Sequence, residues 1–169
     1  MTIKVVRRLL VGSLLLLSAA CHPKPKEITP LQRKTAANLV SEAQFAVTVR
    51  DQARAADLYE KAAALCPDNA EYWLGLGVSR RQLEQRPAAQ KAYEAALQAC
   101  RDAYAHDDKD PGPLIEQIYI LALLGRVHDA RATLAKVRAA HGDNAVVRNF
   151  TEQSLNQLLA DPGFKANAL

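Results

Sequence analysis

The residues that could perform chemistry in this chain are few, and the densest group of them is acidic. Asp107, Asp108 and Asp110 stand together just before Pro111, and closely spaced carboxylates are ligands that Ca²⁺ prefers. A calcium loop would also need oxygen ligands at alternating positions and a glutamate at its far end, and this segment lacks that pattern. We therefore expect Asp110 to cap a helix that begins at Pro111, while its neighbours favour the positive end of that helix.

The histidines do not indicate a metal centre either. His22, His106, His128 and His141 are not spaced as ligands of one ion. The sequence also has no motif for a nucleophile with its base, for paired catalytic carboxylates or for a phosphate-binding loop. We predict that the protein is not an enzyme and that it binds no metal and no cofactor.

The first twenty residues have the composition of a secretory signal peptide. Lys4, Arg7 and Arg8 precede an almost wholly apolar run over residues 9–17, and small residues follow at 18–20. The apolar run is about half as long as the roughly 20 residues that a membrane-spanning helix needs. We predict a signal peptide over residues 1–20 in preference to a membrane span.

Cys21 directly follows Ala19 and Ala20, a pattern that resembles the lipobox of bacterial lipoproteins. In that family the signal is cut just before the cysteine, which is then acylated; the sequence departs from the usual box in having Ser18 where leucine is common. The resemblance implies a lipid anchor on Cys21, and His22 in place of aspartate implies an outer-membrane anchor that faces the periplasm. An inner-membrane anchor, or an ordinary signal peptide that leaves Cys21 unmodified in the soluble periplasm, is the alternative.

The basic charge of the chain belongs mostly to the signal segment. The chain has 22 basic and 18 acidic residues, and removal of residues 1–20 takes away three of the basic residues and no acidic one. Because the remainder is nearly neutral, we predict no nucleic-acid partner.

The rest of the chain is predicted to be a short tether followed by helices. Residues 21–29 are polar and proline-rich, which predicts a tether, and Thr29 followed by Pro30 marks the start of the first helix. Beyond Pro30, apolar residues recur at three- and four-residue spacing and no stretch alternates as a strand would. The predicted fold class is therefore all-α.

Internal repetition indicates how these helices are arranged. A shift of 34 residues superposes identical residues, namely Ala55 on Ala89, Tyr59 on Tyr93, Glu60 on Glu94, Ala62 on Ala96 and Cys66 on Cys100. Together with Trp73, Leu74-Gly75 and Ala89-x-x-x-Tyr93, this pattern resembles the tetratricopeptide repeat family. The resemblance implies an α-α superhelix of about three helix-turn-helix repeats and a role in protein–protein interaction.

The predicted helical domain covers residues 30–160, with repeats at about 36–69, 70–110 and 111–144 and a capping helix at 145–160. Asp68 and Glu71 predict a capping box at the start of the second repeat. The third repeat is displaced by 41 residues, and the additional seven residues near 101–110 predict two extra helical turns or, alternatively, a loop insertion. Pro162-Gly163 predicts a loose tail over 161–169.

Cys66 and Cys100 form an even pair once Cys21 is set aside, and the periplasm permits disulfides. Equivalent sites of adjacent repeats lie on helices about 8–10 Å apart, whereas a disulfide needs α-carbons about 4.4–6.8 Å apart. Two buried free thiols are the favoured prediction, with a disulfide as the alternative.

In the tetratricopeptide family the first helix of each repeat lines a concave groove, so the resemblance implies a binding surface for a protein segment. The residues in register with that surface are Val40, Ser41, Gln44, Glu71, Leu74, Val78, Arg81, Ile115, Glu116 and Tyr119. They lack the Lys, Asn and Arg set that holds chaperone C-termini, so we expect an extended segment or an amphipathic helix of an envelope protein. Alternatively, these residues pack on one another or the terminal helix fills the groove.

These features predict an envelope lipoprotein that acts as an adaptor or assembly factor for a periplasmic or outer-membrane complex. The alternative is a self-associating structural lipoprotein without a peptide-binding groove, in which the exposed ends of the repeat array stack between chains. The oligomeric state and the identity of the partner complex stay open.

Overall fold

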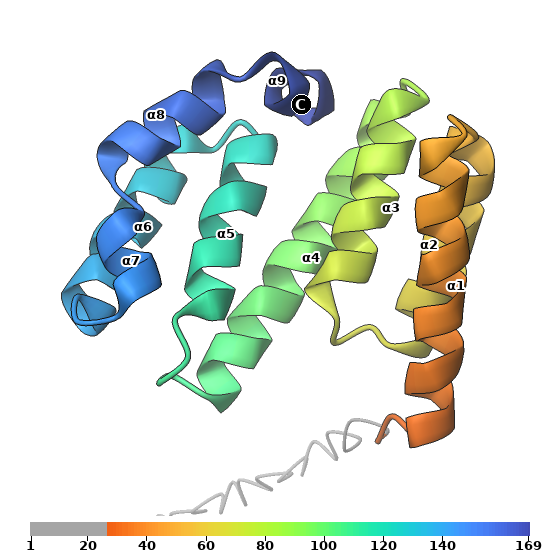
Figure 1. Ribbon diagram of the computed structural model, residues 1–169, viewed down its shortest axis with the longest axis horizontal. Coiled ribbons are helices and arrows are strands. Elements are labelled where there is room, and N and C mark those ends of the chain that lie inside the picture. The colour runs from red at the N-terminus through yellow and green to blue at the C-terminus, as the bar shows by residue number, and fades with distance from the viewer. Residues whose placement is uncertain (1–26) are drawn as a thin grey trace, which may run out of the picture.

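The computed structural model describes residues 27–169; the predicted signal peptide, the lipidation of Cys21 and most of the tether lie outside these residues. The described residues form nine α-helices and no strand (Figure 1). The helices are α1 Pro30–Thr48, α2 Gln52–Leu65, α3 Ala70–Gln82, α4 Arg86–His106, α5 Gly112–Leu123, α6 Val127–His141, α7 Ala145–Asn149, α8 Glu152–Ala160 and α9 Pro162–Asn167. The prediction of an all-α fold is confirmed.

Consecutive helices pair into three hairpins that stack into a helical-repeat solenoid (Figure 1). α1 packs on α2, α3 on α4 and α5 on α6, while α2 contacts α3 and α4 contacts α5. The first hairpin begins where Thr29 and Pro30 predicted it. The Gln32 amide donates to Thr29 Oγ1 at 3.2 Å and the Thr29 amide donates to Gln32 Oε1 at 3.0 Å, which satisfies two amides at the helix start.

The turn inside each hairpin has the same backbone conformation. Arg50, Glu84 and Gly125 adopt positive φ angles of 62°, 61° and 72°, and they are separated by the 34 and 41 residues that separate the sequence repeats. Each turn also closes with an equivalent main-chain hydrogen bond, such as the 2.9 Å bond from the Gln85 amide to the Arg80 carbonyl. The period found in the sequence is therefore the period of the structure.

The additional residues of the longer repeat lengthen α4. This helix has 21 residues and α2 has 14, so the seven-residue difference is helical and the predicted extra turns are confirmed over a loop insertion. Tyr104 in the extension reaches the end of α6, where its hydroxyl lies 3.3 Å from Nε2 of His141. Lys136 Nζ lies 4.9 Å from the centre of the Tyr104 ring.

Two expected helix starts differ in detail. Asn69, and not Asp68, caps α3 by accepting a hydrogen bond from the Glu71 amide at 3.0 Å. Asp68 instead pairs with Arg33 of α1, with 2.8 Å between Oδ2 and Nη2. The α5 helix begins at Gly112, whose amide donates to Asp110 Oδ1 at 2.9 Å.

The C-terminal part differs most from the prediction. The expected single capping helix over 145–160 is two helices, α7 and α8, separated at Phe150 and Thr151, because Thr151 and Ser154 form a new capping box there. The expected loose tail over 161–169 contains α9, which Asp161 caps through a hydrogen bond from the Phe164 amide. Phe164 is buried, so this segment is part of the packed structure.

Small residues and glycines bring neighbouring helices close together. A methyl group on Gly77 would overlap the ring of Tyr93, and one on Gly75 would lie 2.5 Å from the ring of Tyr59.

Cys66 and Cys100 are both free and buried. No helix among residues 27–169 has the length and apolar character that a membrane crossing requires.

Candidate interaction groove

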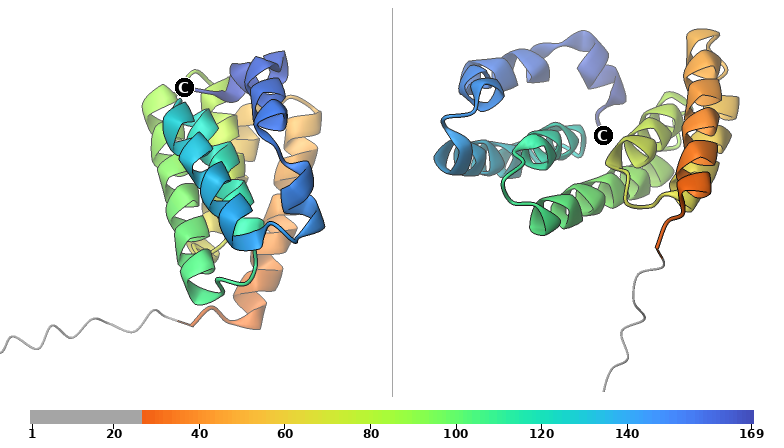
Figure 2. Two further views of the ribbon diagram at one scale, coloured as in Figure 1. Left: turned by 90° about the vertical axis from the view of Figure 1, so that its left-hand side faces the viewer. Right: turned by 60° about the horizontal axis from the view of Figure 1, so that its bottom comes forward.

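The first helices of the hairpins, α1, α3 and α5, share the side of the solenoid on which the C-terminal helices lie. Figure 2 shows α7–α9 on the side of α5 that faces away from α4, and α9 contacts both α3 and α5. We call the surface formed by α1, α3 and α5 the concave groove. Every predicted groove residue lies on one of these three helices.

The predicted groove residues divide into an exposed group and a packed group. Glu71 on α3 and Ser41 and Gln44 on α1 are exposed. The others are half-buried, namely Val40, Leu74, Val78, Arg81, Ile115, Glu116 and Tyr119. The apolar members from α3 and α5 pack against the largest core cluster, which also contains Phe164. The α3 and α5 parts of the set therefore come together, whereas Ser41 and Gln44 stay in solvent.

One end of the groove is occupied by the chain itself. The rings of Phe164 and Tyr119 form an edge-to-face pair, with 5.4 Å between the ring centres and 75° between their planes. Arg81 Nε donates to the Ala168 carbonyl at 2.8 Å, and the Tyr93 hydroxyl donates to the Asn167 carbonyl at 2.8 Å. Arg81 and Tyr119 were predicted to face a partner, and here they hold the C-terminal segment.

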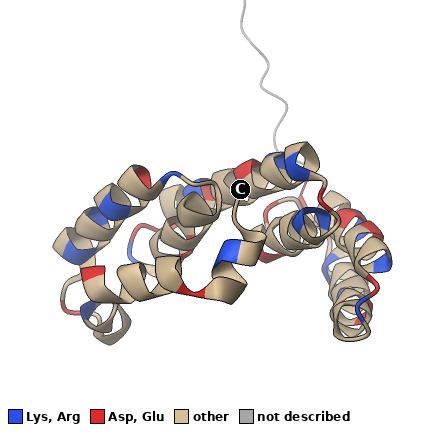
Figure 3. Ribbon diagram, turned by 90° about the horizontal axis from the view of Figure 1, so that it is seen from above, with Lys and Arg blue, Asp and Glu red and all other residues tan. Residues whose placement is uncertain are grey.

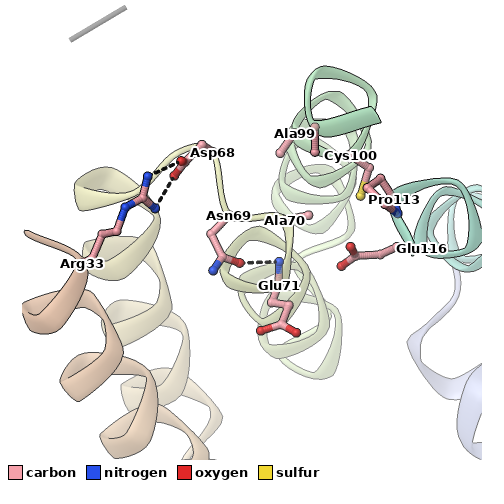
Figure 4. Close-up of a pocket in the computed structure, with 10 residues that line it drawn as sticks. Arg33, Asp68, Asn69, Ala70, Glu71, Ala99, Cys100, Pro113 and Glu116 are labelled. Atoms are coloured by element: carbon pink, nitrogen blue, oxygen red, sulfur yellow. Dashed lines mark hydrogen bonds and ion pairs between the residues drawn. The ribbon is translucent and has the colours of Figure 1, made fainter. Parts of the chain in front are cut away.

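The other end of the groove is open and forms a pocket of about 290 Å³ (Figure 4). The α2–α3 turn, the end of α4 and the start of α5 line it, and the Arg33–Asp68 ion pair forms one wall. Glu116 extends from α5 toward α3, and Glu71 of α3 also lines the pocket. Cys100 of α4 lies behind Glu116.

Of the three carboxylates that line this pocket, Glu71 and Glu116 have no basic partner in the described part of the chain, whereas Asp68 pairs with Arg33. The ion pairs there involve other acidic residues. Burial raises the pKa of the Glu116 carboxyl, and the negative charge of Glu71 adds to this rise, although a hydrogen bond from Cys100 opposes it. Burial also raises the pKa of the Cys100 thiol, and Glu116 reinforces that effect. Glu116 therefore carries an incompletely compensated charge that a cation would stabilise.

The arrangement offers binding chemistry. Over residues 27–169, no cluster of three or more His, Cys, Asp or Glu side chains is placed to hold a metal ion. Figure 3 shows basic and acidic residues interspersed along the helices. The groove can thus offer apolar contacts, main-chain recognition and one acidic pocket.

Sequence reasoning missed three contributors to the groove. Arg33 and Cys100 line the pocket although neither lies on the predicted surface. Phe164 fills the other end. The only sequence indication of the last was Asp161 followed by Pro162, the same type of helix start as Thr29 and Pro30.

Comparisons with known proteins find likeness in structure only. No protein-family model matches the chain, and no curated protein matches it. The Arabidopsis OM64 TPR domain aligns with 17% identity and a TM-score of 0.45 over 75% of this chain and 98% of its own. The first TPR of Spaghetti (RPAP3), solved with the HSP90 peptide SRMEEVD, aligns with 17% identity and a TM-score of 0.46 over 76% of this chain and 98% of its own.

Proposed function

We propose that the protein is a non-catalytic adaptor of the bacterial cell envelope that holds a partner protein in its concave groove. The observation that carries this proposal is the open pocket, in which Glu116 is half-buried near Glu71 and forms no ion pair with a basic residue among residues 27–169. A half-buried charge is costly unless it is paired. A partner that places a Lys or Arg side chain between the two carboxylates would supply the missing charge.

The surroundings of the pocket define the rest of the partner segment. Leu74 and Ile115 are half-buried and belong to the apolar surface of α3 and α5. A segment with a basic residue beside apolar residues therefore fits the open end, either extended or as an amphipathic helix. The partner would be an envelope protein, because the anchor on Cys21 places the domain at the periplasmic side of the outer membrane.

Site-specific photocrosslinking in the native envelope tests the binding role. A photoreactive residue at Ser41, which is exposed on α1, should capture a protein, whereas one at Lys91, which is exposed on α4, should not. Glu116→Lys should reduce capture at least tenfold, because it places a cation where the partner's cation would lie. Glu84→Lys, at an exposed turn, is the matched control. Equal capture from positions 41 and 91, or capture unaffected by Glu116→Lys, contradicts the proposal.

The anchor is tested separately. Cys21→Ser should either release the protein into the soluble periplasm or block removal of the signal peptide, since serine cannot form the thioether. The measurement is membrane fractionation together with the apparent mass of the protein. Unchanged membrane association after normal processing would rule out the lipid anchor while leaving the groove proposal intact.

A second candidate function, self-association, is favoured by exposed apolar side chains on the first hairpin of the solenoid. Leu31, Phe45 and Val49 of the first hairpin are 73%, 62% and 56% exposed, and apolar exposure of this kind at a repeat end favours stacking between chains. Sedimentation of the protein over a hundredfold concentration range distinguishes the two functions. A dimer that Phe45→Glu dissociates supports stacking, and a monomer at every concentration supports the adaptor alone.

A further inference from the structure

The segment over residues 161–169 occupies the groove between α3 and α5 in the manner of a bound peptide. Figures 2 and 3 show it turning back from α8 toward α3, so that its end lies beside helices distant from it in sequence. We call residues 161–169 the C-terminal arm. The Leu169 amide donates to the Leu123 carbonyl at 2.9 Å, which ties the end of the arm to the end of α5.

Most of the polar contacts that hold the arm recognise its main chain. Arg81 donates to the Ala168 carbonyl, Tyr93 donates to the Asn167 carbonyl, and the Leu123 carbonyl accepts from the Leu169 amide. Such contacts provide affinity for any segment that follows the same backbone course. The arm's identity is read mainly by Phe164, which is 5% exposed and packs against Tyr119.

The arm is joined to the solenoid through weak elements. α7 has five residues, α8 has nine and α9 has six, and helices this short are marginal in isolation. The chain changes direction between α7 and α8, at Phe150 and Thr151, which are not helical. Release of the arm breaks the packing of Phe164, Ala168 and Leu169 and a few hydrogen bonds, whereas the stacked hairpins keep their own contacts.

We propose that the groove between α3 and α5 is a peptide-binding surface that the C-terminal arm occupies in cis, and that a partner segment displaces the arm. The favoured partner segment carries an aromatic residue in the place of Phe164 and an apolar residue five positions later, in the place of Leu169. This inference rests on the proposed function, because it assigns a partner chemistry and a means of regulation to the same groove. The open acidic pocket lies outside the arm's contacts, so a partner can engage it before the arm leaves.

Occupation in cis has a quantitative consequence for binding. The apparent affinity of a competing segment equals its intrinsic affinity multiplied by the fraction of molecules whose arm is released. If the arm is docked in more than about nine of ten molecules, a peptide binds the intact chain at least about tenfold more weakly than a chain without the arm.

The test uses the arm itself as the probe. A fluorescent peptide with the sequence of residues 162–169, Pro-Gly-Phe-Lys-Ala-Asn-Ala-Leu, is titrated against the full chain, a chain that ends at Asp161 and the full chain with Phe164→Ala. We expect the peptide to bind both altered chains at least about tenfold more tightly than the unaltered chain. Lys165→Ala in the full chain is the matched control, because Lys165 is exposed, and it should leave the peptide excluded.

Two further titrations check that the peptide enters the groove. A peptide with alanine in place of its phenylalanine should lose binding, and Tyr93→Phe in the chain that ends at Asp161 should weaken it, since the donor to the Asn167 carbonyl is removed. Equal affinity for the full and altered chains, or no binding to a folded altered chain, overturns the inference. Loss of the helical circular dichroism signal on truncation overturns it as well, because a displaceable occupant cannot be required for folding.

The photocrosslinking experiment separates this inference from the proposed function. If a photoreactive residue at position 41 captures the same envelope protein with equal yield from the full chain and from the chain that ends at Asp161, the adaptor function stands and displacement of the arm is wrong. If capture rises in the absence of the arm, both are supported. If neither chain captures a protein yet the peptide binds as expected, the groove binds the arm without an envelope partner, which contradicts both the proposed function and displacement of the arm by a partner segment.

Discussion

At the scale of single residues, the two glycines of α3 determine how closely the helices approach. Gly75 lies against Tyr59 and Gly77 against Tyr93, two tyrosines that occupy equivalent positions of successive repeats. Tyr93 is fully buried and its hydroxyl donates to the Asn167 carbonyl, so its ring has no free space to move into. The repeat spacing therefore depends on the absence of a side chain at these positions.

Gly77→Ala should destabilise the protein by up to about 2 kcal/mol. Overpacking of a filled core costs about 1–3 kcal/mol, and the better helix propensity of alanine returns up to about 1 kcal/mol. In a Tyr93→Leu background the ring is absent, so the same change should become neutral or slightly stabilising. Urea unfolding of the four proteins measures the coupling; an equal cost in both backgrounds would show that Tyr93 is not the obstacle.

Glu116 gives the stability of the fold a pH dependence of definite sign. Because folding raises the pKa of this carboxyl, its proton is bound more tightly in the folded state. The contribution of Glu116 to the free energy of unfolding is then greatest below the unfolded-state pKa of this carboxyl. That contribution falls as the pH rises through the unfolded-state pKa toward the folded-state value. Glu116→Gln should therefore stabilise the protein at pH 7, and the gain should shrink as the pH is lowered through about 4.3. Chemical denaturation across pH 3–7 provides the measurement, and a gain that grows toward low pH would contradict the assignment.

At the scale of the elements, the three hairpin turns share one conformation but differ in how well their residues suit it. Gly125 adopts a positive φ without a Cβ penalty, whereas Arg50 and Glu84 adopt it with exposed side chains. Residues with a side chain pay of order 1 kcal/mol in this region of the backbone. Two of the three turns therefore hold a small, removable strain.

Glu84→Gly should stabilise the fold by roughly 0.5–1 kcal/mol, and Gly125→Ala should destabilise it by a similar amount, because each change alters the strain of a left-handed residue. Glu84→Ala is the control, since it removes the charge but keeps the strain, and it should be close to neutral. The free energy of unfolding from urea titration decides the matter. Equal effects of glycine and alanine at position 84 would assign the change to the charge.

The comparison of sequence and structure is also clearest at this scale. The hairpins were predictable because Tyr59, Tyr93 and the alanines around them act over one or two helical turns, and such packing leaves a fixed period in the sequence. The C-terminal arm was not predicted, because Pro162-Gly163 indicates a flexible tail while Asp161 and Pro162 indicate a helix start. The outcome depends on contacts with Tyr119 and Arg81, which are distant in sequence.

The candidate site was predictable to the same extent. The repeat register, together with the resemblance to the tetratricopeptide family, implied that Glu71 and Glu116 lie on the concave groove. It could not show that the two carboxylates share a pocket with Cys100, or that Arg81 is engaged by the Ala168 carbonyl. These features depend on the crossing of α4 behind α5 and on the return of the arm, neither of which has a local sequence pattern.

At the scale of the whole molecule, the solenoid has two unlike ends. The first hairpin contributes small separate clusters to the core, one of them formed by Ala36, Ala62 and Cys66, and its outer helix α1 exposes Phe45. The other end is covered by α7–α9. These helices share the largest core cluster with α4, α5 and α6, and Cys100 belongs to that cluster. In a stacked array each hairpin is stabilised only by its neighbours. The first hairpin has one neighbouring hairpin and, among residues 27–169, no helix that covers α1, so it should open first.

The two buried thiols report this difference directly. Burial raises the pKa of both Cys66 and Cys100, so each reacts with a thiol reagent only when its surroundings open. In the Cys21→Ser protein at sub-denaturing urea, we expect Cys66 to be alkylated about tenfold faster than Cys100 or more, which corresponds to about 1.4 kcal/mol less free energy of opening. Mass spectrometry of the labelled peptides gives both rates in one sample, with fully denatured protein as the reference for intrinsic reactivity.

Truncation at Asp161 should then accelerate the alkylation of Cys100 and leave that of Cys66 unchanged. The reason is that the arm packs on the core cluster that contains Cys100, whereas Cys66 belongs to another cluster. Equal rates for the two thiols at every urea concentration would instead mean that the solenoid opens as one cooperative unit.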